Sequence, residues 1–218
     1  MHRGRLYGRL RLLARGLGAC GFRWRVEGAD HVPARGPVIV AGNHVSLLDP
    51  VLIGATCHRP IEFMAKRELF AYPVLGRLLH HLGAFPVDRS RPGRTPLQRA
   101  IDILQSGGAV GIFPEGKRNH HTSLFPPATG VGWLAIRTRC PVVPVALSGF
   151  DPSTMWCWPI RGRLRVRYGP PLSFPPERYP RTDRLWRLAA TDDVVRALRA
   201  LLDEPVVLAP PSRQGGLS

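Results

Sequence analysis

A histidine and an aspartate, His44 and Asp49, stand with four residues between them just after the apolar residues 37–41. An imidazole takes up a proton near neutral pH, because its ordinary pKa is about 6.5, and a carboxylate on its other nitrogen fixes the tautomer and stabilises the imidazolium. Such a pair could remove the proton from a hydroxyl group. The spacing alone is weak evidence, because pairs of this kind also arise by chance.

The residues on either side of the pair indicate how it is positioned. Residues 37–41 are short, apolar and rich in β-branched side chains, which favours a buried strand. Asp49 and Pro50 are typical of an N-cap and the first residue of a helix, and the apolar residues 51–55 follow them. We therefore expect His44 to leave the end of a strand and Asp49 to open a helix.

Ser46 offers an alternative chemistry, in which its hydroxyl would be the nucleophile and His44 the base. Ser46 lies only two residues from His44, and the sequence contains no G-x-S-x-G elbow of the kind that presents a nucleophilic serine. We therefore discount a serine triad.

The composition is that of one globular domain with an unusual charge. The chain has 218 residues, of which 44% are hydrophobic, and it carries 31 Lys and Arg against 15 Asp and Glu. The formal net charge of +16 predicts attraction to anionic surfaces. All of these cations except Lys66 and Lys117 are arginines, which a GC-rich genome would explain, but codon bias does not explain the sign of the charge.

The cysteines and the hydropathy pattern indicate a compartment. Cys20, Cys57, Cys140 and Cys157 show no C-x-x-C spacing, and the N-terminus lacks the apolar core of a signal peptide, so we expect reduced thiols in the cytoplasm. No apolar window approaches the 18 or so residues that cross a bilayer. Any membrane contact is therefore expected to be peripheral or monotopic, on the cytoplasmic face of the cell membrane.

Residues 1–20 predict a basic amphipathic helix, because Leu6, Leu10, Leu13 and Leu17 recur at helical spacing among arginines. Such a helix could lie on anionic lipid headgroups or pack on the domain with a solvated charged face. We favour the membrane. The chain then divides into this helix at 1–20, a main domain at 21–204, and a Pro/Gly/Ser-rich tail at 205–218 that we expect to be disordered.

Two glycine-rich stretches resemble nucleotide-binding motifs but lack their context. Residues 16–21 match G-x-G-x-x-G, which needs a strand before it and a helix after it, whereas here a helical pattern precedes and a strand-like one follows. Residues 111–118 nearly match the phosphate-binding loop, but Arg118 replaces the hydroxyl that would reach Mg²⁺ and Pro114 removes an N–H. We therefore discount a nucleotide cofactor.

The main domain alternates strand and helix patterns. Strands are expected over 22–26, 61–65, 109–113, 142–149 and 163–168, with a short extended segment at 83–89. Helices are expected over 73–82, 96–106, 128–138 and 182–202. The period-two alternation at 163–168 is typical of an edge strand. The alternation predicts an α/β fold, with one mixed, largely parallel sheet flanked by helices in a single domain.

Four sequence blocks occur in the order found in one known family. They are residues 43–50 with His44 and Asp49, residues 87–89 ending in Arg89, residues 113–118, and residues 143–145. With these blocks the chain, over roughly residues 20–170, resembles the 1-acylglycerol-3-phosphate (lysophosphatidate) acyltransferase family of glycerolipid acyltransferases. The four blocks in order are far more specific than any one of them.

The resemblance implies a function and roles for particular residues. It implies transfer of a fatty acyl group from an acyl-CoA or acyl-carrier-protein thioester to a lysophospholipid hydroxyl, most directly lysophosphatidate giving phosphatidate, with no cofactor and no metal. His44 would be the general base and Asp49 would orient it, and the block at 143–145 is associated with the acyl donor. The residues implied to hold the acceptor's glycerol phosphate are Arg89, Glu115, Gly116 and Arg118.

Several alternatives stay open. Lys117 and Asn119 replace the family's usual Thr and Ser, and Thr129 replaces a basic residue before Gly130, so the acceptor could be another lysolipid or a glycolipid. Arg89 could also be a surface residue paired with its neighbour Asp88. The charge of +16 would also suit a non-enzymatic binder of anionic membranes or nucleic acid. Such a binder has no use for the histidine–aspartate pair, and no interleaved aromatics mark a nucleic-acid partner.

Overall fold

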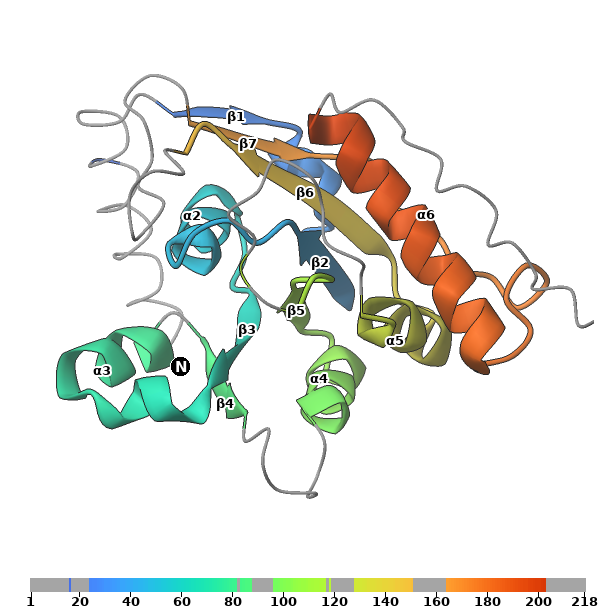
Figure 1. Cartoon of the computed structure of the whole chain (residues 1–218), viewed down its shortest axis with the longest axis horizontal. Helices are drawn as coiled ribbons and strands as arrows, with labels where there is room; N and C mark the ends of the chain where they lie inside the picture. Colours follow the sequence, from blue (N-terminus) through green and yellow to red (C-terminus); the bar gives the residue numbers. More distant parts are fainter. Residues whose placement is uncertain are drawn as a thin grey trace, which may run out of the picture.

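One seven-stranded sheet organises the part of the chain that the computed structural model describes, which is residues 24–81, 83–87, 96–116, 118, 128–150 and 164–202, with Gly16. The spatial order of the strands is β1-β7-β6-β2-β5-β3-β4 (Figure 1). Neighbouring strands are parallel throughout, except that β6 and β7 are antiparallel. The strands are β1 (Arg25–Glu27), β2 (Val38–Gly42), β3 (Glu62–Lys66), β4 (Phe85–Val87), β5 (Ala109–Ile112), β6 (Val142–Ser148) and β7 (Arg165–Tyr168).

Helices cover both faces of this sheet (Figure 1). Helices α4 (Pro96–Gln105), α5 (Gly130–Thr138) and α6 (Arg184–Leu202) pack on one face, and α2 (Asp49–Thr56) packs on the other. Helix α3 (Pro73–His81) follows a short 3₁₀ helix, η3 (Arg67–Ala71), near β3 and β4, and another 3₁₀ helix, η2 (Ala29–His31), follows β1. The predicted α/β fold in a single domain is confirmed.

Strand β2 lies in the middle of the sheet and is buried along its whole length. Ile39 and Ala41 join the apolar cluster under α4, α5 and α6, while Val38 and Val40 join the cluster under α2. Successive side chains of a strand point to opposite faces, so a strand covered on both faces is apolar at every position. This is why residues 37–41 form a continuous apolar run.

The prediction that residues 163–168 form an edge strand is wrong. Strand β7 lies between β6 and β1, and β1 is the edge strand. The alternation arises because Val166 and Tyr168 are buried on one face, while Arg165 is exposed on the other. Period-two alternation therefore indicates that one face of the strand is exposed to solvent. It does not indicate that the strand lacks a neighbouring strand on one side.

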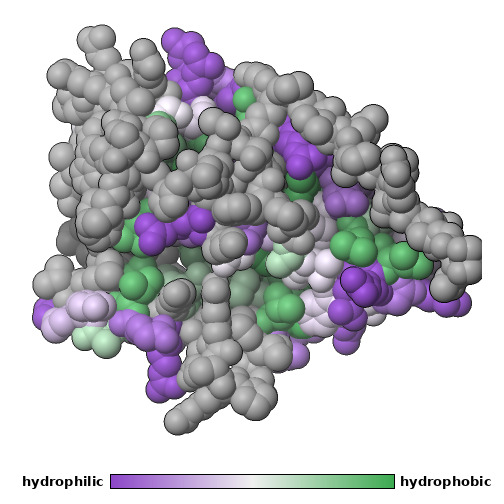
Figure 2. All heavy atoms as spheres, in the orientation of Figure 1, coloured by the Kyte–Doolittle hydropathy of each residue, from purple (hydrophilic) through white to green (hydrophobic). Residues whose placement is uncertain are grey.

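Several predicted segments lie outside the described residues. They are the amphipathic helix at 1–20 apart from Gly16, the loop that carries Arg89, and the tail at 205–218. Among the described residues, no helix is both long and apolar enough to span a bilayer. Figure 2 shows hydrophobic residues scattered among hydrophilic ones on one face, and the large hydrophobic side chains that are exposed include Tyr72 and Leu185.

Candidate active site

The predicted histidine–aspartate pair is formed at the end of the central strand. The turn 43–48 leaves β2, and Asp49 is the first residue of α2. His44 Nδ1 and Asp49 Oδ2 are 2.8 Å apart, the distance of a strong hydrogen bond. The histidine side chain is 19% exposed and the aspartate is fully buried, so a ring that can be reached from solvent rests on a carboxylate that cannot.

Asp49 is not the N-cap that its place before Pro50 predicts. Leu48 occupies the N-cap position, and no side chain caps the helix. The Asp49 carboxylate points back at the preceding turn, where Oδ2 accepts the N–H groups of Val45 at 2.7 Å and Ser46 at 2.8 Å. The carboxylate that the sequence assigns to the helix is thus used to hold the turn that carries His44.

Burial dominates the electrostatics of this aspartate. It raises the pKa of the Asp49 carboxyl above its ordinary value of 3.8, and the hydrogen bond and charge of His44 oppose the shift, together with the N–H groups of Ser46 and Val45. The folded protein therefore binds the carboxyl proton of Asp49 more tightly than the unfolded chain does. This difference in proton affinity stabilises the folded state at low pH, and the stabilisation is lost as the pH rises through the pKa of the folded state. Above that pKa the charged form is kept at a cost in stability.

The loop after β5 contacts His44 from a second direction. Because β2 and β5 are parallel neighbours, their carboxyl ends lie at the same edge of the sheet, which we call the carboxyl edge. The Phe113 ring stacks on the His44 imidazole with 4.2 Å between centroids and 17° between planes. Phe63 stacks behind Phe113 at 5.7 Å, and a Cβ at Gly111 would lie 2.1 Å from the Phe63 ring, so glycine is needed there.

Glu115 lies in the same loop and binds the main chain of His44. Its side chain is 7% exposed, and its Oε1 accepts the His44 N–H at 3.0 Å. Its other oxygen, Oε2, is buried without a hydrogen-bond partner among the described residues, as is Oδ1 of Asp49. Two buried carboxylates therefore hold three consecutive N–H groups, those of His44, Val45 and Ser46.

The remaining predicted site residues are placed differently. Gly116 turns the chain with a φ of 67°, and Arg118, two residues further along, is exposed. The block at 143–145 lies inside β6, where Val143 and Val145 are fully buried core residues. Arg89 is outside the described residues.

Asn43 and Phe113 are neighbours of His44 that sequence reasoning did not select. The Asn43 amide donates to the Leu147 carbonyl at 2.9 Å and accepts the Leu147 N–H at 2.7 Å, which ties the end of β2 to β6. In the sequence, Asn43 and Phe113 are marked only by their places in two of the four blocks, near His44 and Glu115. Ser46, the nucleophile of the discounted triad, is fully buried, and its hydroxyl accepts the Leu48 N–H at 3.2 Å.

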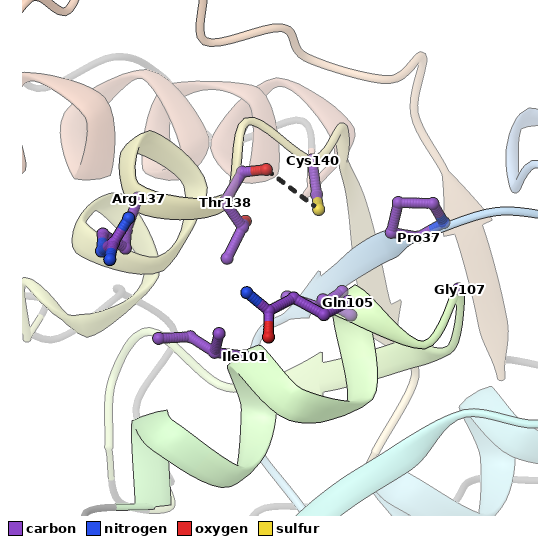
Figure 3. Close-up of a pocket in the computed structure, with 8 residues that line it drawn as sticks. Pro37, Ile101, Gln105, Gly107, Arg137, Thr138 and Cys140 are labelled. Atoms are coloured by element: carbon purple, nitrogen blue, oxygen red, sulfur yellow. Dashed lines mark hydrogen bonds between the residues drawn. The ribbon is translucent and has the colours of Figure 1, made fainter.

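A cavity of about 280 Å³ lies at the other edge of the sheet (Figure 3). Pro37, Gly107 and Cys140, which line it, lie just before β2, β5 and β6, so it opens at the amino ends of these strands. We call this the amino edge. The Cys140 thiol points to the Thr138 carbonyl at 3.5 Å. The cavity is separated from His44 by the length of the strands and is not part of the candidate site.

No cluster of three or more His, Cys, Asp or Glu side chains that could hold a metal ion occurs among the described residues. The site so defined is a histidine–aspartate pair at the carboxyl edge of an α/β sheet, where open sheets of this kind place their ligands.

Comparison with known proteins shows the family of the chain. The acyltransferase family model matches residues 23–148. The 1-acyl-sn-glycerol-3-phosphate acyltransferase of Bacillus subtilis is 32% identical over 149 residues, which are 68% of this chain and 73% of that protein. The human 1-acyl-sn-glycerol-3-phosphate acyltransferase alpha is 32% identical over 159 residues, covering 70% of this chain and 56% of the human protein. The chain thus spans about half the length of this mammalian relative.

The fold is also that of a solved structure. The crystal structure of the 1-acyl-sn-glycerophosphate acyltransferase PlsC of Thermotoga maritima matches with a TM-score of 0.71 and 24% identity, over 89% of this chain and 79% of that one. The chain belongs to the acyltransferase family.

Proposed function

We propose that this protein transfers a fatty acyl group from a thioester, acyl-CoA or acyl-carrier protein, to a hydroxyl group of lysophosphatidate and so forms phosphatidate. The observation that carries the proposal is the hydrogen bond of 2.8 Å between a partly exposed His44 ring and the buried Asp49 carboxylate. The names of the relatives in bacteria and mammals support the acceptor.

His44 is the general base in this proposal. With Nδ1–H donated to Asp49, Nε2 carries the lone pair that removes the proton from the acceptor hydroxyl. The hydroxyl oxygen then attacks the thioester carbonyl carbon, the carbon–sulfur bond breaks, and the proton passes from His44 to the departing thiolate. No group of the protein is acylated. The negative charge of Asp49 favours the imidazolium that forms on the way.

Three N–H groups of the turn after β2 are not available to stabilise the oxyanion. The N–H groups at His44, Val45 and Ser46 already bind the carboxylates of Glu115 and Asp49.

Arginine side chains are proposed to hold the acceptor's phosphate. A guanidinium binds phosphate with two parallel hydrogen bonds, and Arg118 is exposed just beyond the turn at Gly116. Arg89 is the second proposed ligand. A buried carboxylate repels phosphate, so we leave Glu115 out of this group.

Peripheral association with the cytoplasmic face of the membrane completes the proposal. The net charge of +16 favours anionic lipid, and residues 1–20 are the proposed contact. Deletion of residues 1–19 should lower the fraction of protein that sediments with liposomes containing anionic phospholipid. An unchanged bound fraction would remove this role from the segment.

The general base is tested by His44→Ala. We expect acyl transfer from labelled acyl-CoA to lysophosphatidate to fall about 10²- to 10⁴-fold, which is what a positioned base contributes. Circular dichroism and liposome binding should match those of the unmodified protein. Transfer at the unmodified rate would exclude His44 as the base.

The acceptor is tested with a panel of lysolipids offered with the same labelled acyl-CoA. Lysophosphatidate should be acylated faster than lysolipids whose phosphate carries a headgroup and faster than glycolipids. Arg89→Ala and Arg118→Ala should each raise KM for lysophosphatidate more than KM for the thioester. A better acceptor without a free phosphate would identify the alternative lysolipid or glycolipid activity, which Lys117, Asn119 and Thr129 leave open.

A further inference from the structure

The loop after β5 makes two independent contacts with one residue of the turn after β2. Glu115 Oε1 accepts the main-chain N–H of His44 at 3.0 Å, and the Phe113 ring lies parallel to the His44 imidazole at 4.2 Å. The first contact fixes the backbone position from which the side chain starts. The second restricts rotation of the ring out of its plane with Phe113.

Both contacts are themselves held in place. Glu115 is 7% exposed, so its carboxylate has little freedom to exchange His44 for water. Phe113 is backed by Phe63, which occupies the space left by the absent side chain at Gly111. The turn bond from Gly116 N–H to the Phe113 carbonyl, at 3.0 Å, closes the loop between the two contacting residues.

We infer that Phe113 and Glu115 form a clamp that fixes the His44 main chain and ring in the orientation in which Asp49 can bind Nδ1. In this inference, which rests on the proposed function, they are positioning residues for acyl transfer, and Glu115 is not a ligand of the acceptor's phosphate. The geometry of Glu115 supports this assignment, because its Oε1 already accepts the His44 N–H and its Oε2 is buried.

The electrostatics agree with the same assignment. A carboxylate disfavours a phosphate bound beside it, and the Asp49 carboxylate, which is hydrogen-bonded to the ring, favours an imidazolium at His44. A group that stabilises the protonated base acts on the rate of the chemical step, while a phosphate ligand acts on acceptor binding. The two roles therefore predict different kinetic constants.

The Glu115 contact is tested by two variants of nearly equal length, Glu115→Gln and Glu115→Met. Gln keeps an oxygen that accepts the His44 N–H, whereas Met has no comparable acceptor. For Met we expect kcat to fall about 10- to 100-fold, the cost of a misplaced catalytic group, with KM for lysophosphatidate changed less than about 3-fold. Gln should recover most of this loss. Glu177→Met, which removes an exposed carboxylate, is the control and should behave as the unmodified enzyme.

The Phe113 contact is tested by Phe113→Leu, with Phe113→Tyr as the variant that keeps the ring. Leu keeps an apolar side chain of somewhat smaller volume but cannot stack, so kcat should fall about 5- to 20-fold, and Tyr should restore it. An increase in KM for lysophosphatidate with kcat unchanged, in either the Met or the Leu variant, would overturn the clamp. So would a Gln or Tyr variant as impaired as its partner at equal thermal stability.

A readout that does not depend on acyl transfer separates failure of the clamp from failure of the proposed function. The ¹⁵N chemical shifts of the His44 ring report which nitrogen carries the proton. The unmodified protein should show one tautomer protonated at Nδ1, and the Met and Leu variants should show averaged or broadened ring signals. Ring signals identical to those of the unmodified protein would overturn the clamp, even if the chain proved to transfer no acyl group at all.

Discussion

At the carboxyl edge of the sheet, two buried carboxylates hold the turn after β2, whereas at the amino edge one arginine holds the loops that enter β2 and β5. Asp49 and Glu115 accept three main-chain N–H groups. At the other edge, the Arg59 guanidinium donates to the carbonyl oxygens of Pro33 at 2.9 Å, Gly36 at 2.7 Å and Gly107 at 2.9 Å. The charged side chains in these contacts are therefore acidic at the carboxyl edge and basic at the amino edge.

The signs follow from the direction of the chain. A parallel α/β sheet leads from strand ends into helix N-termini at its carboxyl edge, where main-chain N–H groups are left over. It leads from helix C-termini into strands at its amino edge, where carbonyl groups are left over, as at Gly107 after α4. Carboxylates are therefore suited to the first edge and guanidinium groups to the second.

The two edges differ in what they leave unsatisfied. Asp49 Oδ1 and Glu115 Oε2 are buried without partners among the described residues. Each buried, incompletely paired carboxylate lowers stability, and both lie beside the proposed base. At the amino edge each Arg59 contact is a donor matched to an acceptor. The carboxyl edge, which carries the site, thus contains destabilising unpaired oxygens, whereas the Arg59 contacts at the amino edge stabilise the fold.

Asp49→Asn, at the carboxyl edge, should reduce catalytic activity. The amide keeps an oxygen for the turn but removes the negative charge 2.8 Å from the His44 ring. For charge centres about 4 Å apart at an effective dielectric constant of about 20, such a charge stabilises the imidazolium by about 4 kcal/mol, so kcat should fall about 10³-fold. Steady-state acyl transfer measures the loss. Activity within a few-fold of the unmodified enzyme would show that the Asp49 charge is not used.

The same substitution should change the pH dependence of stability. In the unmodified protein the raised pKa of Asp49 makes stability fall as the pH rises from about 4, the ordinary carboxyl value, through the folded pKa. The Asn variant lacks this titration, so its Tm relative to the unmodified protein should increase over that interval. Thermal melts at several pH values test the sign. A relative Tm that decreased instead would contradict the upward shift.

The sequence allowed more of the fold than of the site to be predicted. Apolar runs such as residues 37–41 locate buried strands because each strand side chain must enter one of two cores. The neighbours of a strand are set by contacts between distant segments, so the place of β7 inside the sheet was missed. The contact between His44 and Asp49 was suggested by their local spacing, and the four family blocks supported it.

The contacts missed at the site join residues that are far apart in the sequence. Glu115 is 71 residues from the His44 N–H that it accepts, and Asn43 is 104 residues from Leu147. No periodicity relates such positions, and the family blocks named Glu115 without its geometry. Asp49 was misassigned for the opposite reason, because the local rule for an aspartate before a proline was overridden by the two N–H groups of the turn.

Arg59→Met, at the amino edge, should reduce the stability of the fold. The methionine keeps part of the apolar stem but leaves three carbonyl groups without their common donor. Arg59 is half-buried, so water can replace some of the lost bonds, and we expect unfolding to become easier by about 2–3 kcal/mol. That corresponds to a fall in Tm of about 5–10 °C in a chain of this size.

Activity separates the two edges in this experiment. Below the transition, kcat and KM of Arg59→Met should stay within about 2-fold of the unmodified enzyme, because the loops before β2 and β5 lie a strand length from His44. Arg137→Met is the matched control, since this exposed arginine lies at the same edge and lines the cavity there. Its effect on stability should stay within about 0.5 kcal/mol. A loss of kcat in Arg59→Met without a loss of Tm would mean that the amino edge positions the site as well, and the division between the edges would not hold.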